Sequence, residues 1–368
     1  MPGQDFIVIP DAAPVTVALE PAQSALHSLL LLLRAESISG FSDWVTRTAS
    51  ALTPQERRRH ELVILGLHYA VLPEKSWPSF PAYIDHLTSC NPIALRDKML
   101  TTYSRFAPVL EGGKNHYGEP QMIDWDEVLK DADSYLEFLS ERFCEDALDE
   151  ELEREAYSYV IDPPAMQDLI ISHLRKMWDE HLAPEWEQVK PMLQDAVRAF
   201  QQIDFSSMSQ FQAAQFITGQ ELEKEKWEKV LEKAKKVIFV PTAHVGPYLG
   251  KFWTGDTLCV LFGARLPEGS QFHAPDLSRA EIVVRLNALA DDNRLRILKH
   301  ISEKGELSSQ EIMTGLGLSQ SATSRHLKQL SATGYLSERR CNGAKCYQLN
   351  TERIENTLQA VSSFLSTK

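Results

Sequence analysis

The sequence has few cysteines and no long apolar run. Its five cysteines in 368 residues are widely spaced, odd in number and without a C-x-x-C pair, so a secreted disulfide framework is not expected. The most apolar run, residues 29–33, is far shorter than the ~20 residues that span a bilayer. No basic segment precedes it and no small-residue cleavage site follows it, so it does not indicate a signal peptide. We therefore expect a cytoplasmic protein that makes no membrane contact.

The sequence also lacks the local signatures of common enzyme classes. It contains no G-x-S-x-G, no H-E-x-x-H and, among its eleven histidines, no H-x-x-x-H. Residues 246–251 come nearest to a phosphate loop, but they are one residue short, Phe252 stands where Ser or Thr is required, and Pro247 removes a backbone donor. We therefore expect no catalytic residues, no metal and no cofactor, and a protein that is not an enzyme.

Positive charge is scarce overall and unevenly distributed. The 38 Lys+Arg against 51 Asp+Glu give a net charge of −13, which taken alone argues against a nucleic-acid partner. Residues 277–368, however, carry 13 Lys+Arg and 9 Asp+Glu, a balance of +4, whereas residues 1–276 carry −17. All seven tryptophans also lie before residue 277. Two compositions in one chain indicate two domains with different partners.

The first part of the chain is predicted to be mostly helical, with a small sheet. Helical periods fill most of residues 22–235, and Thr53, Pro54 and Glu56 form the start of a helix with a capping box. Five β-prone runs predict strands: residues 6–9, 15–19, 236–241, 248–253 and 257–263. We expect the early strands to pair with the late ones in a small antiparallel sheet, with a hairpin turn at residues 254–256. The expected fold class is therefore mainly α with small β-sheets.

The last part of the chain shows two helices joined by a tight turn. A helix over about residues 278–290 is followed by a capping cluster at 291–293 and a second helix. Ser308 can cap the next helix, and Ser319 can cap the one over residues 319–330. The glycine-bearing turn between these last two helices is typical of a helix-turn-helix.

A hairpin and a terminal helix follow the helix-turn-helix. Asn342 and Gly343 stand between β-prone arms, the strongest short-range hairpin signal, and a hairpin in this place is a wing. The terminal helix carries an apolar seam spaced by four, three and four residues: Ile354, Leu358, Val361 and Leu365. Such a seam is long enough to pair with another helix.

Residues 277–368 resemble the ArsR/SmtB-type winged-helix transcriptional regulators, of the larger kind that carry an uncharacterised N-terminal domain. The resemblance is carried by residues 286–298 (LNALADDNRLRIL), 318–330 (LSQSATSRHLKQL), 334–336 (GYL) and 347–349 (YQL). It implies a protein that binds double-stranded promoter DNA as a homodimer, by the family's habit as a repressor. It also implies a dimer interface on the first and last helices of this region: Ile282, Leu286, Ile354, Leu358, Val361 and Leu365.

The helix over residues 319–330 is the expected recognition helix. Its geometry turns Ala322, His326, Leu327 and Leu330 toward the domain. Gln320 suits a bidentate contact with adenine, and Arg325 suits guanine or a phosphate. The expected DNA contacts are the polar residues of this helix and the cations of the wing: Ser319, Gln320, Ser321, Thr323, Ser324, Arg325, Lys328, Arg339, Arg340 and Lys345.

The resemblance does not extend to metal or redox sensing. Some metal-responsive members carry a cysteine pair in the helix before the recognition helix, and this chain has Ser308 and Ser309 there. Other members carry histidines and acidic residues in the terminal helix, and residues 351–367 of this chain contain no His or Cys. Cys341 and Cys346 flank the wing tip. A two-residue turn would pair Cys341 with Ala344 and leave Cys346 opposite Arg339, so no strain-free disulfide is expected.

The predicted domains are residues 1–263, a linker at 264–276 and the winged helix at 277–368. The first domain is acidic and rich in aromatic residues, and it is attached to a DNA-binding domain. Such a domain suits a sensor that binds a small-molecule effector. The effector would change DNA binding by binding more tightly to one of two conformations of the protein. The expected pocket residues of such a sensor are Trp44, Trp178, Trp186 and Trp253, although tryptophans belong more often to a core. Two alternatives stay open for the first domain: a protein-interaction or dimerisation scaffold and, with less support, an enzyme tethered to the DNA reader.

Overall fold

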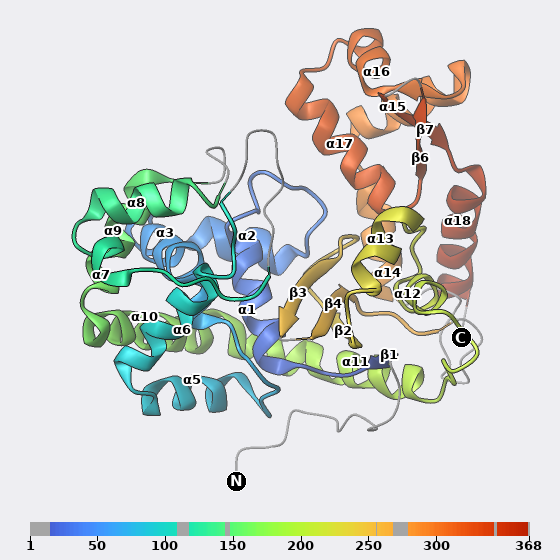
Figure 1. The fold of residues 1–368 in the computed structure, drawn as a ribbon. Coiled ribbons are helices and arrows are strands. Elements are labelled where there is room, and N and C mark those ends of the chain that lie inside the picture. The colour runs from blue at the N-terminus through green and yellow to red at the C-terminus, as the bar shows by residue number, and fades with distance from the viewer. Residues whose placement is uncertain are drawn as a thin grey trace. The chain divides into compact units, whose positions relative to one another are not determined.

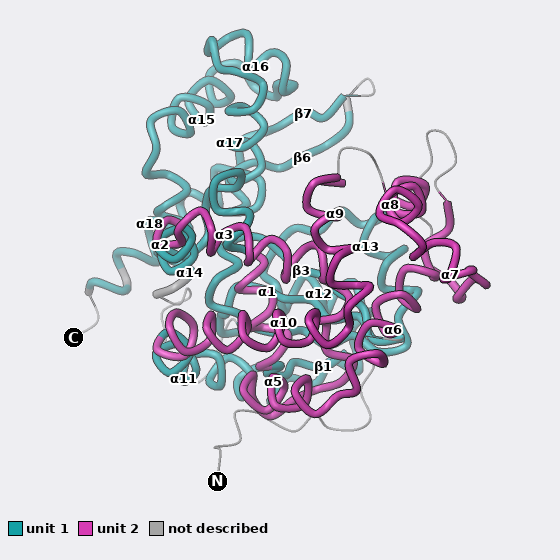
Figure 2. Tube along the Cα trace, turned by 90° about the vertical axis from the view of Figure 1, so that its left-hand side faces the viewer, with its two compact units in different colours: residues 1–20, 31–49, 185–368 teal, residues 21–30, 50–184 magenta. Residues whose placement is uncertain are grey.

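The computed structural model describes residues 15–108, 118–143, 148–254, 256–267, 279–341 and 344–366. The chain forms two compact units, coloured separately in Figure 2. Unit 1 comprises residues 1–20, 31–49 and 185–368, and unit 2 comprises residues 21–30 and 50–184. The structure is 62% helical and the described residues form two small sheets, so the expected class, mainly α, is confirmed. No helix of these described ranges is long and apolar enough to cross a bilayer.

Unit 2 is built from helices (Figure 1). Its elements, with the first shared between both units, are α1 (Pro21–Leu32), α3 (Pro54–Glu61), η1 (Leu62–Gly66), α4 (His68–Val71), α5 (Phe80–Ser89), α6 (Pro92–Tyr103), α7 (Trp125–Val128), α8 (Ala132–Ser140), α9 (Glu150–Val160), α10 (Pro163–Met177) and η3 (Trp178–Leu182). The capping box predicted for α3 is confirmed, because the Thr53 backbone N–H donates to Glu56 Oε2 at 2.9 Å and the Glu56 N–H donates to Thr53 Oγ1 at 3.3 Å.

Two histidines form a buried polar pair inside unit 2. His60 Nε2 lies 2.9 Å from the Leu29 carbonyl oxygen, and His60 Nδ1 lies 2.9 Å from His173 Nε2. Burial lowers the pKa of His60 to about 4 and that of His173 to about 3, so both rings are neutral at neutral pH. A carbonyl only accepts, so the neutral His60 carries its proton on Nε2 and accepts on Nδ1 from His173 Nε2–H.

The larger described sheet of unit 1 has four strands in the order β1-β2-β4-β3. They are β1 (Val15–Val17), β2 (Lys236–Thr242), β3 (Gly250–Thr254) and β4 (Thr257–Gly263). The predicted pairing of the N-terminal strand with the later ones and the β3–β4 hairpin are confirmed, while residues 6–9 lie outside the described residues. The expectation of an antiparallel sheet was wrong, since β1 and β4 both run parallel to β2. Their continuous apolar runs are typical of parallel strands buried on both faces.

Further helices of unit 1 lie between β1 and β2 in the sequence. They are α2 (Asp43–Ala51), α11 (Ala183–Gln201), α12 (Gln210–Thr218) and α13 (Lys224–Leu231). Of the linker expected at residues 264–276, only residues 264–267 lie within the described ranges.

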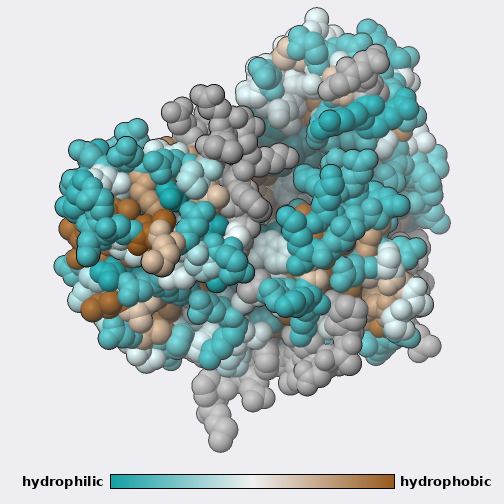
Figure 3. Space-filling model, viewed as in Figure 1, coloured by the Kyte–Doolittle hydropathy of each residue, from teal (hydrophilic) through white to brown (hydrophobic). Residues whose placement is uncertain are grey.

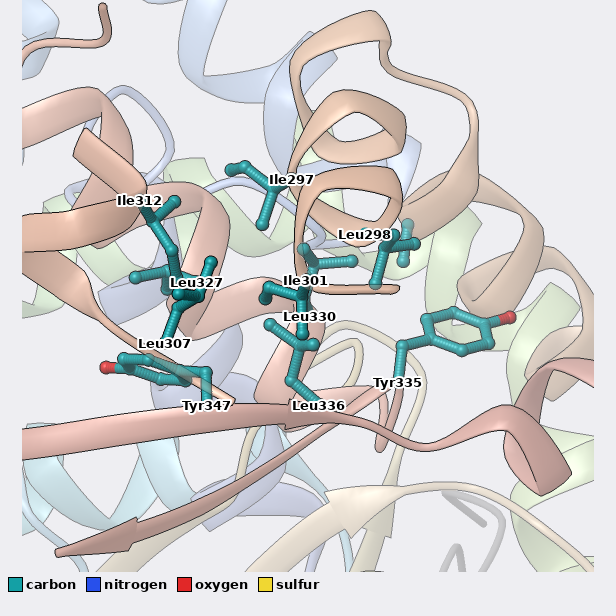
Figure 4. Close-up of a cluster of buried hydrophobic side chains, with 11 residues drawn as sticks. Ile297, Leu298, Ile301, Leu307, Ile312, Leu327, Leu330, Tyr335, Leu336 and Tyr347 are labelled. Carbon is teal, nitrogen blue, oxygen red and sulfur yellow. The ribbon is translucent and has the colours of Figure 1, made fainter. Parts of the chain in front are cut away.

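The last part of unit 1 is a winged helix (Figure 1). Its elements are α14 (Arg279–Leu289), α15 (Asp292–Lys304), β5 (Leu307–Ser308), α16 (Ser309–Leu316), α17 (Gln320–Ala332), β6 (Leu336–Cys341), β7 (Ala344–Leu349) and α18 (Thr351–Ser366). Strand β7 pairs with both β5 and β6. Figure 4 shows the apolar core that joins the helices to this sheet, with Leu330 of α17 beside Ile301 of α15 and Leu336 of β6.

Candidate DNA-binding surface

The turn between α16 and α17 is fixed by local backbone chemistry. Gly317 ends α16 in the left-handed region with φ +66°, a conformation that costs glycine little. Ser319 begins α17, and its hydroxyl accepts from the Ala322 N–H at 3.2 Å. Ser308 and Glu311 close a capping box at the start of α16. The caps predicted for Ser308 and Ser319 are therefore confirmed.

The outer face of α17 is polar and accessible. Six of the expected DNA contacts are exposed on it: Ser319, Gln320, Ser321, Ser324, Arg325 and Lys328. Thr323 was predicted to join them, but it is only 2% exposed, and its hydroxyl donates to the Ser319 carbonyl at 2.9 Å. The prediction for Thr323 was wrong because its hydroxyl closes a bond inside the first turn and leaves the methyl against the domain. His326 is buried, as its place on the apolar side predicted.

The wing has the register predicted from its two-residue connection. Cys341 is opposite Ala344, and Cys346 is opposite Arg339. Arg339 forms an ion pair with Glu306, and Lys345 forms one with Glu338 at 2.7 Å.

Among the predicted wing cations, Arg340 is the most accessible to a phosphate. It is exposed and forms no ion pair with a described residue, and the same holds for Arg325 of α17. The positive charge of Arg339 and Lys345, by contrast, is partly neutralised by their carboxylate partners. The surface over this region is mainly hydrophilic on the face seen in Figure 3.

Gln329 is a functional candidate that sequence reasoning missed. It is 1% exposed, and its Oε1 accepts from Ser39 Oγ at 2.6 Å and from Arg294 Nη1 at 2.9 Å. Gly40, with φ +97°, packs so closely that a Cβ there would lie 2.9 Å from Gln329 Nε2. Next to this contact, Lys328 Nζ lies 5.5 Å from the centre of the Tyr248 ring. The second half of α17 therefore contacts two segments of unit 1 that lie far away in sequence.

The helices expected to form a dimer interface pack together within the chain. Ile282 of α14 is buried against Ala360 and Val361 of α18, and Ile354 packs against the winged-helix core. Ile282 was predicted to face a partner, but the α14–α18 contact covers it within the chain. Ile354 and Val361 are only partly buried, and their role in a dimer stays a prediction. Exposed apolar side chains on the same two helices include three with no such cover: Leu286, Leu358 and Leu365.

The four tryptophans expected to contact a ligand differ in burial. Trp178 belongs to unit 2, where it is partly buried and its ring centre lies 5.6 Å from that of Phe80. Trp44 and Trp186 are buried in unit 1, and the ring centre of Trp44 lies 4.4 Å from that of His244. Trp253 is exposed on β3. A ligand-binding role of these four residues stays a prediction.

Metal-ligating and redox-active groups are sparse in the described ranges. No group of three or more His, Cys, Asp or Glu that could hold a metal ion occurs there. The described free cysteines are Cys90, Cys259 and Cys346, of which the last two are buried. Burial raises the pKa of the Cys259 thiol well above its usual range, so this thiol is unreactive at neutral pH.

The helix-turn-helix, the wing beside it and the accessible polar face of α17 together define a winged helix-turn-helix domain of the DNA-binding type. The family model for bacterial regulatory proteins of the arsR family matches residues 291–338. The arsenic resistance transcriptional regulator ArsR2 of Pseudomonas putida is 38% identical over 86 residues, which are 22% of this chain and 75% of that protein. The chain belongs to the ArsR family, and its last quarter carries the segment of a DNA-binding transcriptional regulator within a larger protein.

Two further proteins are each similar to part of the chain. The arsenic resistance transcriptional regulator ArsR1 of Pseudomonas putida is 44% identical over 64 residues, 17% of this chain and 50% of that protein. A solved structure of a possible transcriptional regulatory protein (fragment 1-100) from Mycobacterium bovis is 26% identical, covers 23% of this chain and 92% of its own, and has a TM-score of 0.20.

Proposed function

We propose that the protein is a cytoplasmic transcriptional repressor that binds an operator as a homodimer and is not an enzyme. The observation that carries this proposal is the exposed polar face of α17, which begins at a capped helix N-terminus and presents Gln320 and Arg325. An α-helix fits the major groove, where such side chains read base edges. Arg340 on the wing then contacts phosphates and sets the register.

The dimer is proposed to form through α14 and α18. Leu358 and Leu365, which are 56% and 75% exposed, lie seven residues apart and therefore on one face of α18. Leu286 lies on α14, which packs against that helix. A shared apolar face on two adjacent helices is suited to a self-complementary, two-fold contact.

The preceding part of unit 1 is proposed to tune DNA binding. Ser39, Gly40 and Tyr248 all contact the last two turns of α17, through Gln329 and Lys328. A change of conformation in these segments therefore alters the position of the helix that reads DNA. An effector that prefers one of two such arrangements shifts operator affinity by its differential affinity. This contact favours the sensor hypothesis over a scaffold that senses nothing.

The proposal is tested by footprinting the full-length protein on DNA from its own promoter region. We expect protection of two half-sites about one helical turn apart and an affinity that falls steeply as salt rises. Fluorescence anisotropy with an unrelated duplex of equal length is the control. Equal affinity for both duplexes, or no binding at low salt, would contradict the proposal.

A further inference from the structure

A cavity in unit 1 is lined by four charged side chains that the DNA-binding surface does not use. Its volume is about 80 Å³, enough for a small polyatomic ion. Thr242 and Gly263, at the carboxyl ends of the parallel strands β2 and β4, form one wall, and α14 and α18 contribute to the others. The charged residues that line it are Arg265, Arg285, Arg353 and Glu281. Among the described residues that line the cavity, three guanidinium groups and one carboxylate give a formal charge of +2.

Two of these arginines are held in place by the protein. Arg265 Nε donates to Glu281 Oε1 at 3.1 Å, and Arg265 Nη1 donates to the Phe216 carbonyl at 2.8 Å. Arg353 Nε donates to the Thr333 carbonyl at 3.1 Å, and its Nη2 donates to that of Gly219 at 3.3 Å. Their charges are therefore fixed in position beside the cavity before any ligand arrives.

Arg285 differs from both. It is only 7% exposed, and its guanidinium forms no hydrogen bond or ion pair with any described residue. Burial, and then the nearby Arg353, lower its pKa to about 10, so that it stays charged at neutral pH. A buried charge without a partner is costly, and an anion in the cavity would remove that cost.

We propose that this cavity binds the phosphate group of a small phosphorylated ligand. The planar guanidinium of Arg285 offers paired N–H donors that match the oxygens of a phosphate, and Arg353 and Arg265 add charge. A phosphate group carries nearly two negative charges at neutral pH and so balances the +2 of the cavity, whereas a single carboxylate balances half of it.

The cavity also reaches the recognition helix. Thr333, which ends α17, lines the cavity and accepts the hydrogen bond from Arg353 Nε. Phosphate that draws the Arg353 guanidinium toward itself changes the anchoring of this helix end. The cavity is therefore also the place where a phosphorylated effector would tune DNA binding, and this second role rests on the function proposed above.

Inorganic phosphate is the probe that tests the cavity. Calorimetry and thermal unfolding of the full-length protein, at constant ionic strength set with chloride, should show saturable binding and a rise in Tm of the order of a few degrees. Arg285→Gln should weaken phosphate binding at least tenfold and should not lower Tm in phosphate-free buffer, because it removes an unpaired buried charge. Arg285→Lys keeps the positive charge but lacks the paired N–H donors of the guanidinium, so it should also bind phosphate more weakly.

The matched control is Arg296→Gln, which removes the same charge from an exposed site on α15. It should bind phosphate as the wild type does. Absence of saturable binding to the wild type, or equal binding by the Arg285 and Arg296 variants, would overturn the cavity as a phosphate site. Succinate that binds as tightly as phosphate would overturn the assignment to phosphate.

A separate measurement tests the regulatory role. Phosphate should change the operator affinity of the wild type and leave that of Arg285→Gln unchanged. Phosphate binding is measured without DNA. If the protein binds phosphate but does not bind an operator, only the proposed function is contradicted, and the phosphate site is not. Phosphate binding with unchanged operator affinity contradicts only the role of the cavity in tuning.

Discussion

The side-chain oxygen of Gln329 accepts a 2.6 Å hydrogen bond from the hydroxyl of Ser39, a residue 290 positions earlier in the chain. The same oxygen accepts from Arg294, whose Nε and Nη2 also bond the carbonyls of Ala288 and Asn287 at 2.7 Å. One amide on the recognition helix thus connects an N-terminal segment with the helices behind it. The winged helix is therefore held through the second half of α17, where Lys328, one of the expected DNA contacts, also lies against Tyr248.

Replacing Gln329 should destabilise the protein. Gln329→Ala leaves the Ser39 hydroxyl and one Arg294 donor without their acceptor in a buried place, so we expect the free energy of unfolding to fall by about 1–3 kcal/mol. Urea unfolding of the full chain measures this. Gln320→Ala, at an exposed position of the same helix, should stay within about 0.5 kcal/mol of the wild type. Equal effects of the two substitutions would refute the assigned role of Gln329.

Two arginines should affect DNA binding in different ways. Arg325→Ala should cost about 1–3 kcal/mol of operator binding and relax the preference at one base pair. Arg340→Ala should weaken binding to all sequences alike and reduce the salt slope by about one. Arg339→Ala should have a smaller effect than Arg340→Ala, because Arg339 is already paired with Glu306. Anisotropy titrations over a salt series and a set of single-base operator variants would show a different order if this interpretation is wrong.

A charge on α18 should disrupt the dimer. Leu358→Glu and Leu365→Glu place a carboxylate on the exposed apolar face, and we expect monomers in analytical ultracentrifugation at micromolar concentration. Leu295→Glu is the matched control, since Leu295 is 51% exposed on α15. It should leave the sedimentation coefficient unchanged. Dimers that persist in both α18 variants would exclude this face as the interface.

The His60–His173 pair should make unit 2 sensitive to acid. Both pKa values are lowered in the folded state, to about 4 and about 3, whereas unfolded histidine titrates near 6.5. Between pH 6.5 and 4 the unfolded chain therefore binds more protons, and stability falls as pH falls. We expect each histidine to contribute a loss of about 1–2 kcal/mol between pH 7 and pH 5.

Another buried group of unit 2 acts in the opposite direction. Burial raises the pKa of Glu153 to about 7, so its contribution is present below pH 4.5 and lost as pH rises through 7. The histidine effect is therefore measured as a difference between proteins. Measured by unfolding, the stability of the wild type should fall between pH 7 and pH 5, whereas that of His60→Phe/His173→Leu should not fall, because only the opposite contribution of Glu153 remains. Parallel profiles would contradict a neutral pair.

Much of the winged helix could be predicted because its signals are local. The caps at Ser308 and Ser319 and the wing register, with Cys346 opposite Arg339, each depend on residues within a few positions of one another. The prediction that Thr323 contacts DNA was wrong because helical periodicity places this residue near the boundary between the exposed and the buried face. Periodicity does not show whether its hydroxyl bonds to the backbone of its own helix. The α14–α18 packing that buries Ile282 is a contact between distant segments.

The cavity could not be predicted from sequence, since its charged residues come from three separate places: Arg265 after β4, Glu281 and Arg285 on α14, and Arg353 on α18. Each arginine, seen alone on a polar helix or loop, is typical of a solvated surface. The sheet direction had a weaker signal that was available. Residues 237–241 and 258–262 are apolar without alternation, a pattern that favours parallel strands covered on both faces over an antiparallel sheet.

The bond between Ser39 and Gln329 also bears on how the DNA reader behaves when it is cut from the rest of the chain. A truncated protein that starts near residue 277 would lack Ser39, Gly40 and Tyr248, so water would replace them around Gln329 and Lys328. In this fragment the position of the recognition helix would no longer depend on these three residues. The difference in operator affinity between the fragment and the intact protein would therefore measure how much their contacts with α17 change DNA binding.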